Sequence, residues 1–397
     1  MFTKIYPVKN ILFLMLIAVA CFSCNKETGP ANPPGPLPTS PARNTVFIGG
    51  DDSTLYALNA ATGAVKWLYK LKSSLEISPV VDGNTVYIGE GQPFLPFQVY
   101  ALDATTGALK WRTTQLTGTS ATGVVSNNIL YIPCGPKLIA LNTATGTTVW
   151  EKNLDPIGSS IQSSPTVFNN TVYVSHDSTV YALNAANGNT LWTRVTHGEI
   201  YYSGLAYASG SIYVGNGDFT IYNTENKLYS LNAANGSVNW SVSGSGPMVS
   251  SPTIANGLVY IGSQDNKLYA IDTLTKAVKW TFLTGDYVLS SPSVVNNKVY
   301  VGSGDEFLYC LDAVTGSLVW KKDIGDNILA SPVIADGMVY ISGQLDQMIH
   351  GINAATGAIV WSKHIGTGFS MGGYKSSPCV VDQNGVIHHP GDSGAQN

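Results

Sequence analysis

The sequence has few charged residues and lacks the basic clusters that mark nucleic-acid-binding chains. Only 12% of its 397 residues are charged, about half the usual share, which excludes a charge-rich disordered chain. The formal net charge is -4, and lysine and arginine gather nowhere along the chain, so we expect no nucleic-acid partner. Apolar residues make up 44% of the chain, which is ample for a packed core.

Residue groupings typical of metal sites and hydrolases are also missing. The six histidines show no His-x-x-x-His spacing, and no Gly-x-Ser-x-Gly marks a nucleophilic serine. Single aspartates recur at one position in the repeats described below, but Ca²⁺ takes about six or more oxygens. We therefore expect turn-stabilising roles for Asp52, Asp177, Asp218, Asp265 and Asp305. The sequence predicts no metal site and no catalytic residue.

The apolar run from Ile11 to Ala20 is too short to span a membrane, but it fits an export signal. Two lysines precede the run, and Ala-Cys-Phe-Ser-Cys follows it, which resembles a bacterial lipoprotein signal. We expect residues 1–24 to be this signal and a lipid anchor to hold the chain in a membrane. Cys24 is favoured as the lipidated residue because polar sequence begins straight after it, while Cys21 remains an alternative.

A proline-rich segment follows the signal. Six prolines lie between Thr28 and Arg43, with almost no bulky apolar side chain to bury. Such composition favours an extended spacer of about 3.1 Å per residue. We expect residues 25–44 to be a tether and residues 45–397 to form a folded domain.

All eight tryptophans belong to one motif, which recurs about every 42 residues. The motif reads small residue-Leu/Ile-Asp/Asn-x-x-Thr/Asn-Gly-x-x-x-Trp. Each repeat also holds four short runs rich in β-branched and aromatic residues, separated by turn signals. The pattern predicts an all-β protein, an eight-bladed β-propeller of four-stranded antiparallel blades. The copies end at Trp67, Trp111, Trp150, Trp192, Trp240, Trp280, Trp320 and Trp361.

The motif residues have structural interpretations. We expect the small residue to leave room for a tryptophan from a neighbouring blade, whose indole N–H would find a carbonyl. The glycine would supply a left-handed turn conformation. Lys276 replaces this glycine in the sixth copy and should cost about 1 kcal/mol if the turn is unchanged.

The two ends of the repeat array predict how the ring closes. The first copy lacks the opening Ser-Pro strand, and residues 377–381 supply one after the last copy. The C-terminal strand is therefore expected to complete the N-terminal blade. The run from Val386 to His389 reads as a further strand that competes for the place of residues 46–48, and the sequence does not decide between the two.

The repeat resembles the tryptophan-docking motif of the PQQ-like propeller family, over roughly residues 45–390. With its lipoprotein signal, the chain is most similar to the BamB-type outer-membrane lipoproteins. This resemblance implies a non-catalytic subunit of the machinery that assembles β-barrels in the bacterial outer membrane. We accordingly expect a monomeric, lipid-anchored scaffold that binds an envelope protein partner. An envelope protein that binds a saccharide or small ligand is one alternative, and a PQQ-dependent dehydrogenase is another.

The same family includes quinoprotein dehydrogenases, and the resemblance implies what such an enzyme would contain. It would have two adjacent cysteines, a tryptophan stacked on the quinone, and Ca²⁺ held by acidic and asparagine ligands. The sequence has no Cys-Cys pair, and all its tryptophans lie in the docking motif. We therefore expect no cofactor and no enzymatic activity.

One face of the predicted ring should carry the binding residues. Loops between second and third strands share this face with the crossings between blades, and sequence variation concentrates there. Two insertions, residues 91–97 and 218–225, add apolar side chains that either meet a partner or fold back over their own blades. Several of the candidates are expected around the mouth of the central channel of the ring. These residues either form a binding site or are simply exposed to solvent there. The partner- or ligand-binding candidates are Glu76, Phe94, Phe97, Gln162, Tyr201, Tyr202, Tyr222, Tyr287, Phe369, Tyr374 and Lys375.

Overall fold

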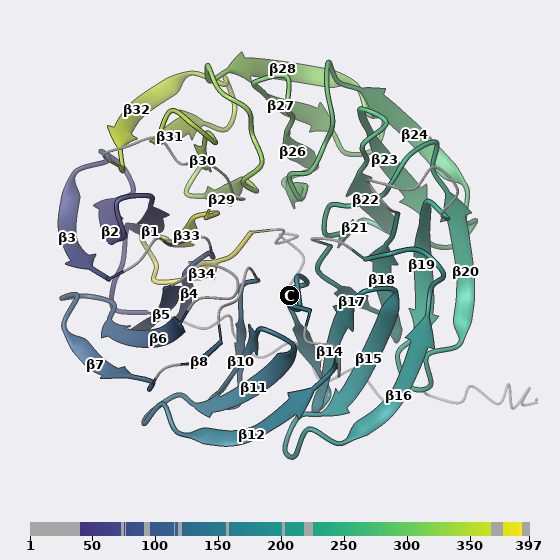
Figure 1. Cartoon of the computed structure of the whole chain (residues 1–397). Coiled ribbons are helices and arrows are strands. Elements are labelled where there is room, and N and C mark those ends of the chain that lie inside the picture. Colours follow the sequence, from purple (N-terminus) through teal and green to yellow (C-terminus); the bar gives the residue numbers. More distant parts are fainter. Residues whose placement is uncertain are drawn as a thin grey trace, which may run out of the picture. The chain divides into compact units, whose positions relative to one another are not determined.

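The computed structural model describes residues 40–72, 75, 77–90, 96–114, 116–117, 121–155, 159–200, 203–217, 225–366 and 376–390. This part consists of strands and turns without a helix, and so holds no helix able to cross a membrane. Its strands form eight antiparallel sheets, the blades of a propeller arranged around a central axis (Figure 1). The predicted fold class is confirmed.

The first four blades follow one another along the chain, and the strands of blades 2 to 4 run from the innermost to the outermost. Blade 1 holds β1 (Thr45–Gly50), β2 (Thr54–Asn59) and β3 (Val65–Lys70). Blade 2 holds β4 (Val80–Asp82), β5 (Thr85–Glu90), β6 (Pro96–Asp103) and β7 (Leu109–Arg112), and β8 (Leu116–Thr117) also pairs with β6. Blade 3 holds β9 (Val124–Ser126), β10 (Ile129–Cys134), β11 (Lys137–Asn142) and β12 (Thr148–Asn153). Blade 4 holds β13 (Thr166–Phe168), β14 (Thr171–His176), β15 (Thr179–Asn184) and β16 (Thr190–Val195).

The remaining blades repeat this order. Blade 5 holds β17 (Ala206–Ala208), β18 (Ser211–Gly215), β19 (Lys227–Asn232) and β20 (Val238–Ser243). Blade 6 holds β21 (Thr253–Ala255), β22 (Leu258–Gly262), β23 (Lys267–Asp272) and β24 (Val278–Leu283). Blade 7 holds β25 (Ser293–Val295), β26 (Lys298–Gly302), β27 (Phe307–Asp312) and β28 (Leu318–Asp323). Blade 8 holds β29 (Val333–Ala335), β30 (Met338–Ser342), β31 (Met348–Asn353) and β32 (Ile359–His364).

The C-terminal strands complete blade 1, as predicted. β33 (Cys379–Val381) pairs with β1, with Val381 opposite Thr45. β34 (Ile387–His388) pairs with β33 on its other side, with Ile387 opposite Val381. The run around residues 386–389 therefore does not compete with β1, because it adds a fifth strand at the inner edge. The N-terminal run and the run around residues 386–389 therefore both belong to blade 1, whose strand order is β3-β2-β1-β33-β34.

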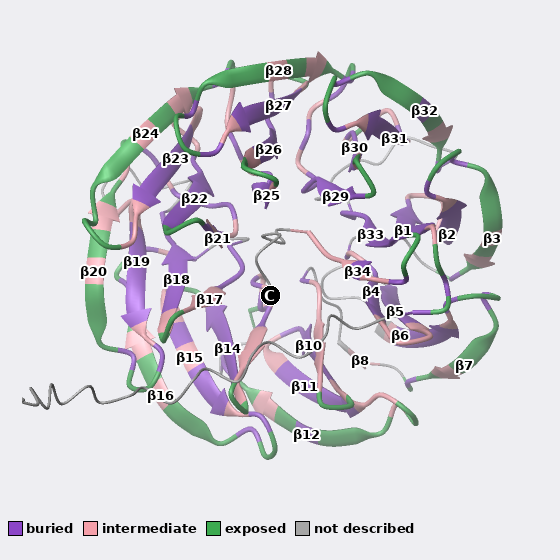
Figure 2. Cartoon of the chain, turned by 180° about the vertical axis from the view of Figure 1, so that it is seen from behind, coloured by how far each residue is buried: buried purple, intermediate pink, exposed green. Residues whose placement is uncertain are grey.

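The hydrophobic core lies between neighbouring blades. The second and third strands are buried along nearly their whole length, as in β26 and β27 of blade 7. The fourth strand alternates between exposed and half-buried residues, as in β28. Figure 2 shows the exposed strands on the outer circumference and the buried strands inside. Each blade therefore contributes two faces to the core and one edge to solvent.

Seven of the eight tryptophans link their own blade to the next. The Trp280 indole N–H donates to the carbonyl of Ala313 at 3.1 Å, and the Trp361 indole closes the ring by donating to Ala60 at 2.9 Å. Equivalent hydrogen bonds are made by Trp67, Trp111, Trp150, Trp192 and Trp320. Because the acceptor always belongs to the following blade, these bonds hold the blades in register.

One detail of the motif interpretation was wrong. The small residue lies directly opposite the tryptophan of its own blade, as Ala57 pairs with Trp67 and Ala270 with Trp280. The neighbouring blade meets the tryptophan through the motif glycine instead. A Cβ on Gly316, whose φ is 72°, would lie 2.6 Å from Cδ2 of Trp280. The small residue therefore clears space within a blade, and the glycine allows contact between blades.

Lys276 adopts the conformation that glycine takes in the other copies. Its φ is 65°, against 72° at Gly316. Its backbone N–H donates to the carbonyl of Asp272 at 2.8 Å, the same turn bond that Gly316 makes to Asp312. The turn is thus the same as in the other copies. Lys276 therefore holds a left-handed backbone conformation, which should cost about 1 kcal/mol.

A tyrosine in the second strand shares the tryptophan's acceptor, which the sequence analysis did not recognise. The Tyr300 hydroxyl donates to the carbonyl of Ala354 at 3.2 Å, and Trp320 donates to the same oxygen at 3.0 Å. The two rings lie 5.9 Å apart between centroids. Because the tyrosine recurs in the second strand of most repeats, its periodicity was a signal available in the sequence.

A hydrogen-bond relay joins the inner ends of the blades. In each bond, the residue just before the first strand donates its backbone N–H to the side-chain oxygen of the equivalent residue in the next blade. Six such bonds, of 2.8 to 3.1 Å, run from Gly204 to Ser251, Ser251 to Ser291, Ser291 to Ser331, Ser331 to Ser377, Ser377 to Ser78 and Ser78 to Thr122.

Candidate interaction face

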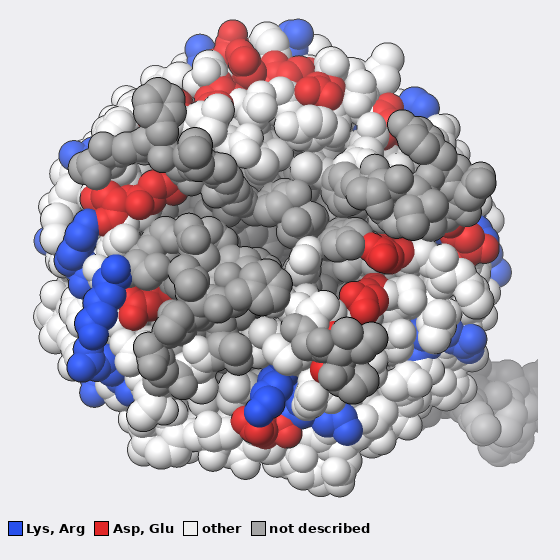
Figure 3. All heavy atoms as spheres, viewed as in Figure 1, with Lys and Arg blue, Asp and Glu red and all other residues white. Residues whose placement is uncertain are grey.

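We call the variable face the side of the ring that carries the turns between second and third strands and the crossings between blades. The opposite side, the uniform-turn face, carries short turns such as Asn296-Asn297, where both residues have positive φ. Figure 3 shows the variable face, with acidic side chains in several groups and many of the lysines and arginines nearer the circumference. The two faces therefore differ in the loops that they carry.

Acidic residues on this face are paired with tyrosines of the third strand. The Tyr56 hydroxyl donates to Asp52 at 2.8 Å, and the Tyr309 hydroxyl donates to Asp305 at 2.6 Å. Burial, followed by the bond to Asp52, raises the pKa of Tyr56 to about 12. Tyr100 with Glu90, Tyr229 with Glu225, and Tyr269 with Asp265 form the same kind of pair.

The paired carboxylates also hold their turns. Asp52, Asp265 and Asp305 each accept the backbone N–H two residues ahead, at 3.1 to 3.2 Å. The turn role predicted for these three is confirmed, while Asp218 lies outside the described residues. Within the described ranges, no three His, Cys, Asp or Glu side chains are grouped to hold a metal ion. These carboxylates are engaged in supporting the loops.

A buried apolar residue anchors most of the crossings. Each anchor is buried and donates its backbone N–H to the turn between the second and third strands of the blade that the crossing leaves. The anchors are Ile161, Ile200, Met248, Val288 and Ile328. Val288, for example, bonds to the carbonyl of Ser263 at 3.0 Å. The crossings are therefore fixed to the blades and present their neighbouring residues from a rigid base.

Two of the predicted binding residues are fully described, and each is next to an anchor. Gln162 follows Ile161 and is half-buried, and its Oε1 is buried without a hydrogen bond. Tyr287 precedes Val288 and accepts the Gly304 N–H with its carbonyl at 2.9 Å. The two residues share the variable face but lie three blades apart, so the structure does not bring them together.

The other candidates are only partly described or lie outside the described residues. Phe97 is the second residue of β6. The residues outside the described ranges are Cys24, Glu76, Phe94, Tyr201, Tyr202, Tyr222, Phe369, Tyr374 and Lys375.

Three further apolar residues lie on the crossings of the variable face. Val249 is buried, whereas Leu289 and Leu329 are half-buried. Each follows an anchor residue directly, so the three occupy equivalent places in successive crossings. Leu289 and Leu329 thus remain as apolar contact points on neighbouring blades.

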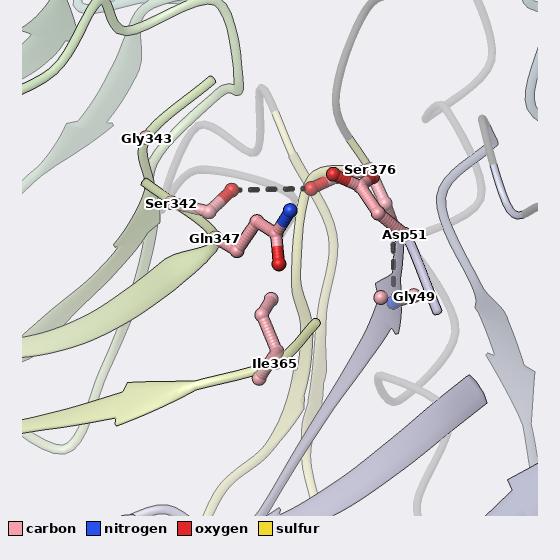
Figure 4. Close-up of a pocket in the computed structure, with 8 residues that line it drawn as sticks. Gly49, Asp51, Ser342, Gly343, Gln347, Ile365 and Ser376 are labelled. Carbon is pink, nitrogen blue, oxygen red and sulfur yellow. Dashed lines mark hydrogen bonds between the residues drawn. The ribbon is translucent and has the colours of Figure 1, made fainter. Parts of the chain in front are cut away.

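A small cavity lies at the seam between blade 8 and blade 1 (Figure 4). Ser342 and Gln347 border it from blade 8, and Gly49 and Asp51 border it from blade 1. Ser376 crosses it, accepting Ser342 Oγ–H at its carbonyl at 3.3 Å and Gly49 N–H at its hydroxyl at 3.3 Å. Its volume is about 10 Å³, barely room for one water molecule and far below the roughly 300 to 1,000 Å³ of small-molecule sites. The cavity belongs to the seam packing.

The described residues do not fit the quinone cofactor used by some propellers of this kind. Seven tryptophan indoles donate between blades, which leaves those rings inside blade contacts. Cys134, Cys310 and Cys379 are buried in three different blades, and none of the three is in a disulfide. Burial raises the pKa of Cys310 to about 11. No step involving a quinone is derived for this chain.

Fold and face together define an eight-bladed propeller built from tryptophan-docking repeats, with rigid loops on one side. The chain belongs to the PQQ-type repeat family described as outer membrane protein assembly factor BamB. The family model matches residues 27–125, 97–216, 176–293 and 284–391. Among curated protein sequences, none matches the chain.

Solved structures share the fold. BamB from Moraxella catarrhalis is 17% identical, with a TM-score of 0.62 over 77% of this chain and 91% of that one. The computationally designed Ika8 protein is 16% identical, with a TM-score of 0.64 over 80% and 92%. A europium-containing methanol dehydrogenase is 15% identical, with a TM-score of 0.61 over 73% and 78%. At these identities the likeness shows the fold alone.

Proposed function

We propose that this protein is a non-catalytic scaffold that binds a protein partner in the bacterial envelope and takes part in assembling outer-membrane proteins. The observation that carries the proposal is the family match, which extends from residue 27 to residue 391 in four overlapping segments. The family is described as an outer membrane protein assembly factor. The engagement of seven tryptophans in blade contacts supports a scaffold over a quinoprotein enzyme.

The variable face is the proposed binding surface. Its crossings are held by buried anchors such as Val288 and Ile328, so Leu289 and Leu329 are presented without a large loss of chain entropy on binding. The uniform-turn face repeats the same short turns from blade to blade and offers less to distinguish one partner from another.

A lipid anchor and tether complete the proposal. Residues 1–24 would direct export and acylation at Cys24, and residues 25–44 would connect the propeller to the membrane. Radiolabelled palmitate should enter the wild-type protein and the Cys21→Ser variant but not the Cys24→Ser variant. Incorporation into a Cys21/Cys24 double variant would contradict the anchor.

Affinity purification of the tagged full chain from envelope membranes tests the partner. We expect an outer-membrane barrel-assembly protein to copurify in stoichiometric amount. The double variant Leu289→Lys/Leu329→Lys should lose the partner, whereas Leu274→Lys on the uniform-turn face, where the leucine is 85% exposed, should retain it. Copurification that survives the double variant but not Leu274→Lys would contradict the proposed surface.

A further inference from the structure

The turns between the second and third strands of blades 6, 7 and 8 and the two crossings between these blades form one continuous strip on the variable face. Gly304 in the turn of blade 7 donates its N–H to the carbonyl of Tyr287 in the first crossing at 2.9 Å. Gln344 in the turn of blade 8 donates in the same way to Asn327 in the second crossing, also at 2.9 Å. On their other sides, the two crossings are bonded through their anchors to the turns of blades 6 and 7. We call this surface the blade 6–8 strip.

The strip carries carboxylates on all three turns and on both crossings. One lysine, Lys267, borders the turn of blade 6, and its Nζ lies 3.4 Å from Asp265 Oδ2. Across the described part of the chain, no lysine or arginine comes within 4 Å of the other five carboxylates. Figure 3 shows acidic side chains gathered over blade 7, at the top of the view. The acidic residues of the strip are Asp265, Asp286, Asp305, Glu306, Asp326 and Asp346.

The tyrosine partners of these carboxylates do not cancel the negative charge. The Tyr309 hydroxyl donates to Asp305 at 2.6 Å. Burial, followed by this bond, raises the pKa of Tyr309 well above its ordinary value of 10. The proton therefore stays on the tyrosine at neutral pH, where carboxylates are ionised. Glu306, the next residue, is exposed to solvent.

Apolar side chains lie among the carboxylates. Leu289 and Leu329 are half-buried and follow the anchors of the two crossings. Leu345, in the turn of blade 8, is 50% exposed. Because each crossing is hydrogen-bonded to the turns on both sides, these side chains are held in place before any partner binds. The strip thus combines apolar contact points with negative charge.

A lysine of this chain already lies against the outer end of the strip. Lys321 of β28 places its Nζ 4.1 Å from the ring centroid of Phe307, the residue that follows Glu306. This distance is typical of a cation–π contact. An ammonium group is therefore accommodated beside the strip, although this one forms no ion pair with its carboxylates within 4 Å.

We propose that the blade 6–8 strip binds a segment of the partner protein that carries lysine or arginine side chains beside apolar ones. The inference rests on the proposed function, since it specifies the chemistry of the partner's contact segment. Apolar side chains of the segment would pack on Leu289 and Leu329, and its cations would face Asp286 and Glu306. The same charge would repel an acidic segment, a nucleic acid or an anionic lipid surface, so it selects as well as attracts.

Binding of defined peptides to the purified full-length protein tests the inference without the native partner. Three fluorescent peptides of equal length combine lysine with leucine, glutamate with leucine, and lysine with serine, and each is titrated against a detergent blank. We expect the lysine–leucine peptide to bind about tenfold more tightly than either of the others. Its affinity should fall as NaCl is raised from about 50 to about 300 mM. Equal affinities of the lysine–leucine peptide and either other peptide would overturn the inference.

Two double variants with the same change in net charge locate the binding. Asp286→Asn/Glu306→Gln should lower the affinity for the lysine–leucine peptide about fivefold. Asp272→Asn/Asp312→Asn alters the uniform-turn face at positions where other copies of the motif have asparagine, so this control should fold and keep the affinity. Equal losses in the two variants would show attraction to net charge alone and would contradict the strip.

The peptide test and the purification of the native partner can fail separately. If a barrel-assembly protein copurifies but the peptides do not discriminate, the present inference is overturned and the proposed function stands. If the peptides discriminate and the charge variants behave as expected, the strip is supported whether or not that partner is the one captured.

Discussion

The backbone N–H of Ser377 donates to Oγ of Ser78 at 2.9 Å, although 299 residues separate them in the chain. Ser331 donates in the same way to Ser377 at 2.9 Å, and Ser78 donates to Thr122 at 3.1 Å. The seam between the C-terminal strand and blade 2 thus uses the same bond as ordinary neighbouring blades. The chain of N–H to side-chain-oxygen bonds therefore continues unbroken across the place where the ring closes.

Ser78→Ala should weaken the closed ring. The variant leaves the Ser377 N–H without its acceptor while keeping the bond that Ser78 N–H donates to Thr122. We expect the free energy of unfolding in urea to fall by about 1 to 3 kcal/mol. Ser241→Ala, an exposed serine of β20, is the matched control and should change it by less than about 0.5 kcal/mol. Equal effects of the two changes would contradict the role of the relay.

Gly316→Ala should destabilise the protein more than Gly257→Ala. The two glycines have nearly the same φ, 72° and 74°, so the cost of the left-handed conformation is shared. A Cβ at position 316 would meet Trp280 at 2.6 Å, whereas at position 257 it would meet nothing within 4 Å. We expect Gly316→Ala to cost at least about 1 kcal/mol more in thermal or urea unfolding. Equal losses would show that the tryptophan contact is not tight.

Lys276→Gly should stabilise the protein. The lysine has φ 65° at a position where the other motif copies have glycine, and relief of this conformation is worth about 1 kcal/mol. Lys279→Gly in β24 is the control, and it should lower the free energy of unfolding because glycine in a strand costs about 0.5 to 1 kcal/mol. Loss of stability in both variants would mean that the Lys276 side chain makes a contact that outweighs its backbone strain.

Stability should decline above pH 10. Burial raises the pKa values of Tyr260, Tyr300 and Tyr340 well above the ordinary value of 10. A raised pKa in the folded state gives stability that is complete below the unfolded value and is lost as the pH rises toward the folded value. Absorbance at 295 nm should show these tyrosines ionising together with the loss of near-ultraviolet circular dichroism. Complete ionisation at about pH 10 with the fold intact would contradict their burial.

The repeat made the fold predictable because each blade needs the same strand lengths and turns. The tryptophan motif alone determined blade number, and the missing first strand in the first copy determined closure. The motif did not show whether the small residue faces the tryptophan of its own blade or of a neighbouring blade. Sequence spacing does not tell which residues of two paired strands lie opposite each other. Opposition of Ala57 and Trp67 became visible only once β2 and β3 were paired.

The candidate site was less predictable. Paired acids and tyrosines four residues apart, such as Asp52 and Tyr56, recur in the sequence and were a readable signal. Contacts between a crossing and a strand, such as Ser159 with His176, join segments without any shared pattern. Such contacts depend on how neighbouring blades pack, and an irregular crossing carries no periodicity that reveals them.

The central claim is that a protein partner binds the variable face, and site-specific photo-cross-linking in intact cells tests it most directly. A photoreactive residue is placed at Gln162, Leu289 or Leu329 on the variable face and at Leu274 or Val314 on the uniform-turn face. We predict partner cross-links from the first three positions and none from the last two. Cross-links only from positions 274 and 314 would contradict the account.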